Sequence, residues 1–194
     1  MALTPVRETI GAVRDVFLKV FELYTGGFSI NTAGFNKGVK LPKGSLLKVD
    51  ESTRLAAPIK TAVSGADSGS ATKHYLVDGH HFQSGDKLGY GGTAHTITSI
   101  TAGTGAFEGM DVVLTQYSLE SAATGDIFYE SSATGDGAGA IKDVPNGILR
   151  YDTHIATGEF ATVAVRGSVY KRRIQAHIAG HLADLKHIHF SDSK

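Results

Sequence analysis

The chain has no cysteine, no tryptophan and only 4 prolines, and it carries no excess of either charge. Without cysteine it can form no disulfide framework, no thiol nucleophile, no iron–sulfur cluster and no cysteine-based zinc site. Lys+Arg and Asp+Glu both number 19, which gives a formal net charge of zero. A nucleic-acid-binding protein needs a cationic excess to displace counterions from phosphates, so we expect no nucleic acid partner.

Long apolar runs are also absent. A membrane-spanning helix needs about 18 consecutive apolar residues, and no stretch of the sequence approaches that length. Near the start, Arg7, Glu8, Arg14 and Asp15 stand where a secretion signal requires an uninterrupted apolar core. The 194 residues, 41% hydrophobic and 20% charged, are typical of a soluble globular protein with one domain or two small ones. We expect no membrane partner.

The first 24 residues carry an apolar stripe. Its members recur at alternating spacings of four and three, the periodicity of a helix or coiled coil: Val6, Ile10, Val13, Phe17, Val20 and Tyr24. Residues 16–24 also alternate and are rich in β-branched and aromatic side chains, which favours a strand. We predict an N-terminal arm over 1–24, helical or extended to about Asp15 and a strand after it. The stripe fits a core face, a coiled coil or a docking arm.

The rest of the chain consists of short apolar runs bounded by Gly, Asp and Ser, a pattern typical of a small barrel or sandwich. Expected strands include residues 45–50 and, after residue 72, the runs HYLVD, DKLGY, AHTITSI, DVVLT and DIFYE. Stretches rich in Gly, Ser and Ala at 64–72 and 133–140 have the composition of linkers. They bracket a segment that we interpret as an insertion in a host domain.

Three parts are therefore predicted: an arm over 1–24, a β-domain of 25–63 plus 141–194, and an inserted β-barrel-like domain over 64–140. Near the end, Ile178, Leu182 and Leu185 share one helical face, and a short strand follows. The predicted fold class is mainly β: a β-sandwich or tulip-like domain with an inserted small β-barrel and a short C-terminal helix.

No catalytic motif stands out. The sequence has no Gly-x-Ser-x-Gly nucleophile elbow and no P-loop, and GDGAGA at 135–140 lacks the strand and helix that a dinucleotide fingerprint needs. The carboxylates considered for glycosidase chemistry are Asp111, Glu120, Asp126 and Glu130, which fall at strand ends and turns where solvated acids are ordinary. We expect no enzyme activity, no catalytic residue and no cofactor.

Histidine is the most distinctive residue type. Five of the nine lie in the last 41 residues: His154, His177, His181, His187 and His189. The spacing of His177 and His181 would place both imidazoles on one face of a helix, as in helical zinc sites, and His187 and His189 alternate on an apparent strand. No Glu completes a metalloprotease motif and no third ligand is fixed by spacing. We predict no metal site, and favour histidines at a surface or at a pH-sensitive interface.

Two short clusters are interpreted as local features. Tyr170-Lys171-Arg172-Arg173 is typical of a solvated strand end or a subunit contact. His80-His81 is expected in a loop before Phe82.

Two stretches resemble lambda-type head decoration proteins of tailed phages. In residues 42–56 a small-residue turn and an apolar strand end in Asp50 and are followed by Ser-Thr-Arg and an apolar residue. In residues 146–174 a Gly-Ile-Leu strand is followed, past a polar loop, by a β-rich strand, Gly167 and another strand. The texture, including TGGFSINTAG at 25–34, is also similar to auxiliary capsid and head-fibre proteins of phages that infect gut Bacteroides, the crAss-like group among them.

This resemblance implies a structural virion protein that binds the major capsid protein and stabilises the outer surface of the head. The family is typically trimeric, which favours a homo-oligomer. Lambda-type decorators are shorter, and this chain adds the 64–140 insertion and a C-terminal tail. We expect the host domain to bind the capsid and the insertion to project, with host-surface glycan as a further partner.

Deletions separate these roles. Loss of 1–24 is expected to abolish capsid attachment, and loss of 65–140 to leave it intact. The alternative function is a carbohydrate- or receptor-binding module of a phage head fibre or tail, with ring candidates Tyr75, Tyr90, Tyr117 and Tyr129.

Overall fold

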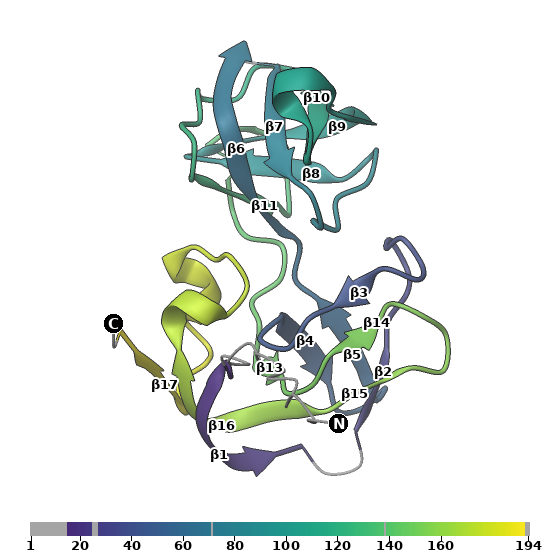
Figure 1. Cartoon of the computed structure of the whole chain (residues 1–194), viewed down its shortest axis with the longest axis vertical. Coiled ribbons are helices and arrows are strands. Elements are labelled where there is room, and N and C mark those ends of the chain that lie inside the picture. Colours follow the sequence, from purple (N-terminus) through teal and green to yellow (C-terminus); the bar gives the residue numbers. More distant parts are fainter. Residues whose placement is uncertain (1–14, 25–26, 71, 138, 193–194) are drawn as a thin grey trace, which may run out of the picture.

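The computed structural model describes residues 15–24, 27–70, 72–137 and 139–192, and strands dominate it (Figure 1). The helices in this part of the chain are short 3-10 turns: η1 (Gly105–Phe107), η2 (Lys171–Arg173) and η3 (Ala179–Leu182). The mainly β fold class is confirmed.

Eight strands form the first sheet. They are β1 (Phe17–Leu23), β2 (Phe28–Ile30), β4 (Leu46–Asp50), β5 (Leu55–Pro58), β13 (Gly147–Leu149), β15 (Phe160–Ala161), β16 (Val163–Tyr170) and β17 (Ile188–Ser191). A small two-stranded sheet, β3 (Lys40–Leu41) with β14 (Thr153–His154), accompanies it.

The first sheet curls round on itself. Its strand order is β1-β16-β13-β4-β5-β2-β15, and β15 and β16 are consecutive in the chain with Thr162 alone between them. Because β2 pairs with β15 while β13 pairs with β16, the strands wrap round into a small barrel. The edge strand β1 continues the pairing along β16.

The central strands of this first barrel are buried on both faces. Successive residues of a strand point to opposite sides: Leu46 and Ile148 belong to one fully buried cluster, and Leu47 and Leu149 to another. Side chains of β2 and β15 complete the inner cluster, whereas the C-terminal segment covers the outer face. The residues that provide this outer cover include Ile174, Leu185 and Ile188.

The second sheet closes on itself. Its strands are β6 (Thr61–Ser70), β7 (Lys73–Val77), β8 (Lys87–Tyr90), β9 (Thr93–Ala102), β10 (Met110–Thr115), β11 (Ile127–Glu130) and β12 (Gly135–Asp136). The order β10-β7-β6-β11-β8-β9 returns to its start because β10 also pairs with β9. All these pairings are antiparallel, and Leu76, Leu88, Val113 and Phe128 fill the interior with no exposure. The strands expected after residue 72 are thereby confirmed.

The prediction that residues 64–72 form a linker is wrong. Residues up to Ser70 belong to β6, which pairs with β7 and β11. Small residues are needed there, because a Cβ on Gly65 would lie 2.6 Å from the sulfur of Met110. The second expected linker, 133–140, contains β12 and is bracketed by a bridge between Ser131 and Ile141.

At the two ends of the chain, the strand predicted after Asp15 is β1, and the predicted short terminal strand is β17. The C-terminal helix is the single 3-10 turn η3. The predicted helical or extended segment before Asp15 lies outside the described residues.

The second barrel and strand β1 lie at opposite ends of the molecule (Figure 1). The chain crosses from the first barrel to the second at Ile59-Lys60, between β5 and β6, and returns between β12 and β13. Because the chain crosses twice at this junction, the contacts made there determine how the two barrels are oriented relative to each other.

Candidate functional site

The C-terminal histidines do not assemble into a ligand set. His181 is fully buried, and its Nδ1 accepts a hydrogen bond from the amide of Ile178 at 3.3 Å. His177 is half-buried, with its Nδ1 2.9 Å from the carbonyl oxygen of Gln175. Burial, and then the nearby His177, lower the pKa of His181 to about 4. His181 is therefore a neutral imidazole packed in the interior. It does not share an exposed helical face with His177, as the spacing suggested.

The remaining C-terminal histidines, His154, His187 and His189, are exposed. Among the described residues, no group of three or more His, Asp or Glu side chains is placed to hold a metal ion.

His80 and His81 are buried where the second barrel meets the first. His80 Nδ1 accepts a hydrogen bond from the amide of Phe82 at 3.2 Å, and its Nε2 lies 3.1 Å from a carboxylate oxygen of Asp111. Since Nδ1 accepts, the ring proton sits on Nε2 and faces Asp111. Burial lowers the pKa of His80, although Asp111 and Asp78 act in the opposite direction. His80 Nδ1 is therefore occupied by the loop amide of Phe82, while Nε2 lies beside the Asp111 carboxylate without a hydrogen bond of good geometry.

The four carboxylates considered for catalysis have different surroundings. Asp126 accepts the hydroxyl of Tyr90 at 2.6 Å and the amide of Ala123 at 2.7 Å, a bond set that lowers its pKa. A carboxylate oxygen of Glu130 lies 2.7 Å from the ammonium nitrogen of Lys142. Glu120 is exposed. Asp126 and Glu130 thus bind groups of the chain itself, Asp111 lies beside His80, and Glu120 faces solvent.

Only one of the four tyrosines considered for glycan stacking presents an exposed ring. Tyr117 is 60% exposed, whereas Tyr75 and Tyr129 are 6% and 4% exposed. Tyr75 stacks on Phe107 with ring centroids 4.1 Å apart. The hydrogen bond to Asp126 raises the pKa of Tyr90 to about 12. Tyr75 and Tyr129 are therefore packing residues, and of the four rings only that of Tyr117 is open to a stacking partner.

The basic cluster at 170–173 supports the start of β1. The guanidinium of Arg173 donates to the carbonyl oxygen of Asp15 at 2.6 Å and lies 4.0 Å from the ring centroid of Tyr170. Lys43 and Arg150 approach the Asp15 carboxylate at 3.6 and 3.5 Å. Burial alone would raise the pKa of Asp15, but the amide of Phe17 and these cations hold it below its usual value. Part of the cluster is therefore an anchor for the arm.

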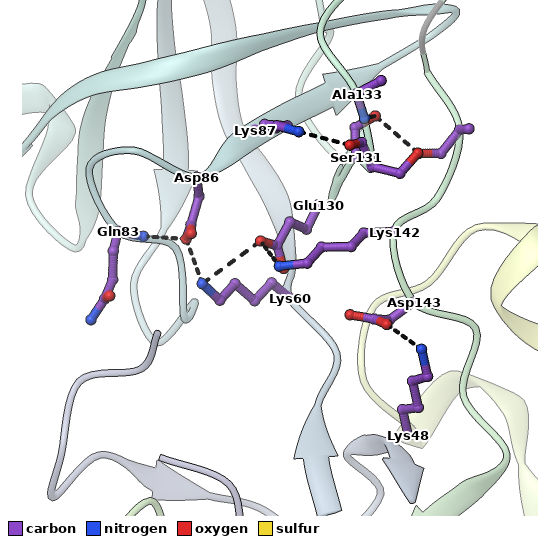
Figure 2. A network of polar contacts seen from close by, with 12 residues as sticks. Lys48, Lys60, Gln83, Asp86, Lys87, Glu130, Ser131, Ala133, Lys142 and Asp143 are labelled. Carbon is purple, nitrogen blue, oxygen red and sulfur yellow. Dashed lines mark hydrogen bonds and ion pairs between the residues drawn. The ribbon is translucent and has the colours of Figure 1, made fainter. Parts of the chain in front are cut away.

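A buried ion network occupies one flank of the junction between the barrels (Figure 2). Lys60 donates to Asp86 at 2.6 Å and lies 4.0 Å from Glu130, with only 3% of its side chain exposed. Its Nζ also lies 4.9 Å from the ring centroid of Phe35, on a loop of the first barrel. Lys142, on the returning connection, donates to Glu130 at 2.7 Å. The network thus joins both crossings of the chain.

Gln175 makes a second set of polar contacts at the junction. Its amide nitrogen donates to the carbonyl oxygen of Ile59 at 2.6 Å and to the hydroxyl of Thr61 at 2.9 Å. Its amide oxygen accepts from Leu46 at 3.0 Å. One glutamine therefore ties the C-terminal segment to β4 and to the start of β6. Sequence reasoning missed both Lys60 and Gln175, because neither stands in a motif.

The edge strand β1 carries three exposed apolar side chains. Leu18, Phe21 and Leu23 are 47%, 58% and 39% exposed. The pairing of β1 with β16 shifts register next to Leu18 and Phe21. Such bulges twist an edge strand and blunt its pairing with further strands, so this surface is suited to side-chain contact.

Comparisons with protein-family models, with curated proteins and with solved structures found no match to the chain. The likeness to phage decoration proteins stays a prediction. In the described part of the chain, no helix has the length and apolar character to cross a membrane.

Proposed function

We propose that the chain is a structural protein of a tailed-phage head, a decoration or auxiliary capsid protein that binds the major capsid protein on the outer surface of the virion. The observation that carries the proposal is the three exposed apolar side chains of β1, Leu18, Phe21 and Leu23, on a strand at the end of the molecule opposite the second barrel. With β1 against the capsid, the second barrel points outward.

The two stretches that resemble the decoration family support this proposal by their position. They are about a hundred residues apart in sequence, yet β4 of the first stretch pairs with β13 of the second, with Leu47 beside Gly147. Both therefore belong to one barrel, the one that carries β1.

An apolar surface of this kind has a physical rationale. Burying three large side chains at about 25 cal/mol per Å² of apolar surface gives a modest affinity for one copy. Many copies on a lattice, or a trimer with three such surfaces, multiply the effect through effective concentration. We propose a homo-oligomer, with a trimer favoured.

The test is co-sedimentation of the purified chain with expanded, undecorated capsids of the virus that encodes it, with bound copies counted by quantitative mass spectrometry. Saturation at a multiple of the icosahedral symmetry supports the proposal, and the number indicates the lattice site. Absence of binding to any capsid form contradicts it.

A pair of matched variants locates the surface. Phe21→Ser is expected to weaken capsid binding about 10-fold or more, as expected for loss of a central aromatic contact. Tyr117→Ser, at a ring of similar exposure on the second barrel, is the control and is expected to bind as the original chain does. Equal loss in both variants would argue against β1 as the binding surface.

A further inference from the structure

The junction between the barrels places two buried histidines next to a buried lysine. The ring of Phe35 is shared between them: its centroid lies 4.9 Å from Lys60 Nζ and 6.1 Å from the centroid of the His81 ring. His81 is 6% exposed and Lys60 is 4% exposed. The junction thus holds a lysine and, in His80-His81, two imidazoles that can gain charge on acidification.

The surroundings of the histidines contain charges of both signs. His80 faces the carboxylates of Asp111 and Asp78. His81 faces Lys60, and it shares a cavity of about 310 Å³ with Lys43 and Arg173 of the first barrel. Behind Lys60 are Asp86, Glu130 and Lys142. Of these cations, Lys60 is the one that acts on His81, and a proton on His81 would be opposed by it.

Burial, and then His80 and Lys60, lower the pKa of His81 to about 4 from its ordinary value of 6.5. The neutral ring is thus the form that the closed junction accepts. A state in which the barrels separate would hydrate His81 and take up its proton at higher pH, so acid favours separation.

We propose that the junction is an acid-sensitive latch. At neutral pH the loop that carries Phe35 is held against Lys60 and the neutral His81. Protonation of His81 adds positive charge beside Lys60, the loop detaches, and the barrels change their relative orientation while each stays folded. This inference does not depend on the proposed capsid function.

Contacts of the loop fit this role. Besides Phe35, it touches the second barrel through the side-chain amides of Asn36 and Gln83, which approach to 2.8 Å. The cores of the barrels are separate clusters. Loss of the loop contacts therefore removes few apolar contacts from either core.

The test uses the absence of cysteine in the chain. Ser118→Cys on the second barrel and Thr157→Cys on the first, both at exposed positions, accept nitroxide labels on the full-length chain. Pulsed electron spin resonance then measures the distance distribution between labels during acidification from pH 6.5 toward 4, the interval between the two values given for His81. Circular dichroism and amide exchange follow the barrel cores in parallel.

A narrow distribution at neutral pH that broadens or shifts before core amides lose protection is the expected result. His81→Gln, which cannot gain the proton, is expected to lower the pH midpoint of this change by about 1 unit. His189→Gln, at an exposed histidine of β17, is the matched control and is expected to leave the midpoint unchanged.

Three outcomes overturn the latch. One is an unchanged distribution down to pH 4, another is a change that coincides with loss of the cores, and the third is the same midpoint in His81→Gln and in the labelled parent. The acid titration of the labelled parent decides the first two outcomes even if His81→Gln fails to fold.

Discussion

At the scale of single residues, burial distinguishes two lysine pairs of equal length. Lys60 with Asp86 and Lys48 with Asp143 both measure 2.6 Å, but the lysine side chains are 3% and 52% exposed. Removing one partner of a buried pair leaves a desolvated charge, which costs about 3–5 kcal/mol. An exposed pair contributes about 1 kcal/mol or less.

We therefore expect Lys60→Met to lower the free energy of unfolding by about 3 kcal/mol and Lys48→Met by less than about 1 kcal/mol. Urea titration followed by circular dichroism measures both. Adding Asp86→Asn to Lys60→Met is expected to restore part of the loss, because it removes the stranded carboxylate and keeps an acceptor for the amide of Gln83, which now donates to Asp86 at 2.7 Å. Equal effects of the two lysine variants would mean that the buried network adds nothing to stability.

The buried ring of His181 predicts a pH dependence of stability. Its pKa in the folded chain is about 4 and its ordinary value is 6.5, so between these values the unfolded chain binds more protons than the folded one. The free energy of unfolding is then constant above 6.5 and falls as the pH drops toward 4, by at most about 1.4 kcal/mol per pH unit for one histidine. His181→Gln is expected to flatten this slope, while His154→Gln, at an exposed site, leaves it unchanged. A slope that His181→Gln does not alter would assign the acid sensitivity to other groups.

At the scale of elements, one glycine sets how closely β1 lies on β16. A Cβ on Gly167 would stand 2.5 Å from the carbonyl oxygen of Lys19 and 3.3 Å from the Cα of Val20. Both contacts are backbone, so β1 itself would have to move. Gly167→Ala is expected to lower the free energy of unfolding by about 2 kcal/mol and to weaken capsid binding by displacing β1.

Gly92→Ala is the matched control for this variant, since a Cβ there meets nothing within 4 Å. It is expected to change stability by less than about 0.5 kcal/mol. Thermal unfolding of the two variants, measured side by side, tests this prediction. Similar stabilities would mean that β1 can shift away from β16 without loss of free energy of unfolding.

Strands formed by short apolar runs between Gly, Asp and Ser could be predicted from sequence, and those built of small residues could not. Strands β7, β9 and β10 are apolar runs of this kind, and the sequence predicts them. The sequence predicts a linker in place of most of β6 because the Gly, Ser and Ala residues there show no pattern. The cross-strand partners of β6 and the side chain of Met110 over Gly65 explain why small residues are used. The i, i+4 spacing of His177 and His181 suggested a helix, but the segment is fixed instead by Gln175 and by packing of Leu185 on the first barrel.

At the scale of the whole molecule, the two barrels and their strand order follow from pairings between residues far apart in sequence, which periodicity does not encode. The same holds for the junction. In the sequence Lys60 is an ordinary lysine between Ile59 and Thr61. Its role follows from Asp86, Glu130 and Phe35, which other segments of the chain place beside it. The apolar stripe near the N-terminus is visible in the sequence, but of its members in β1 Phe17 is buried and Val20 is half-buried, whereas the exposed Leu18 and Phe21 are not part of the stripe.

This organisation predicts that the second barrel can be excised, at boundaries different from 65–140, which would cut β6. Pro58 and Gly147 lie on either side of Leu47, so they are separated by two strand spacings, about 10 Å. Replacing residues 60–143 by about four Gly/Ser residues spans that gap.

The shortened chain retains every strand of the first barrel and loses the bonds of Gln175 to Thr61 and the ion network of Lys60. We expect a cooperative unfolding transition at reduced stability, and undiminished co-sedimentation with capsids, because β1 lies at the opposite end. A folded product that no longer binds would assign binding to the second barrel, and a product without a cooperative transition would mean that the junction makes the two barrels a single folding unit.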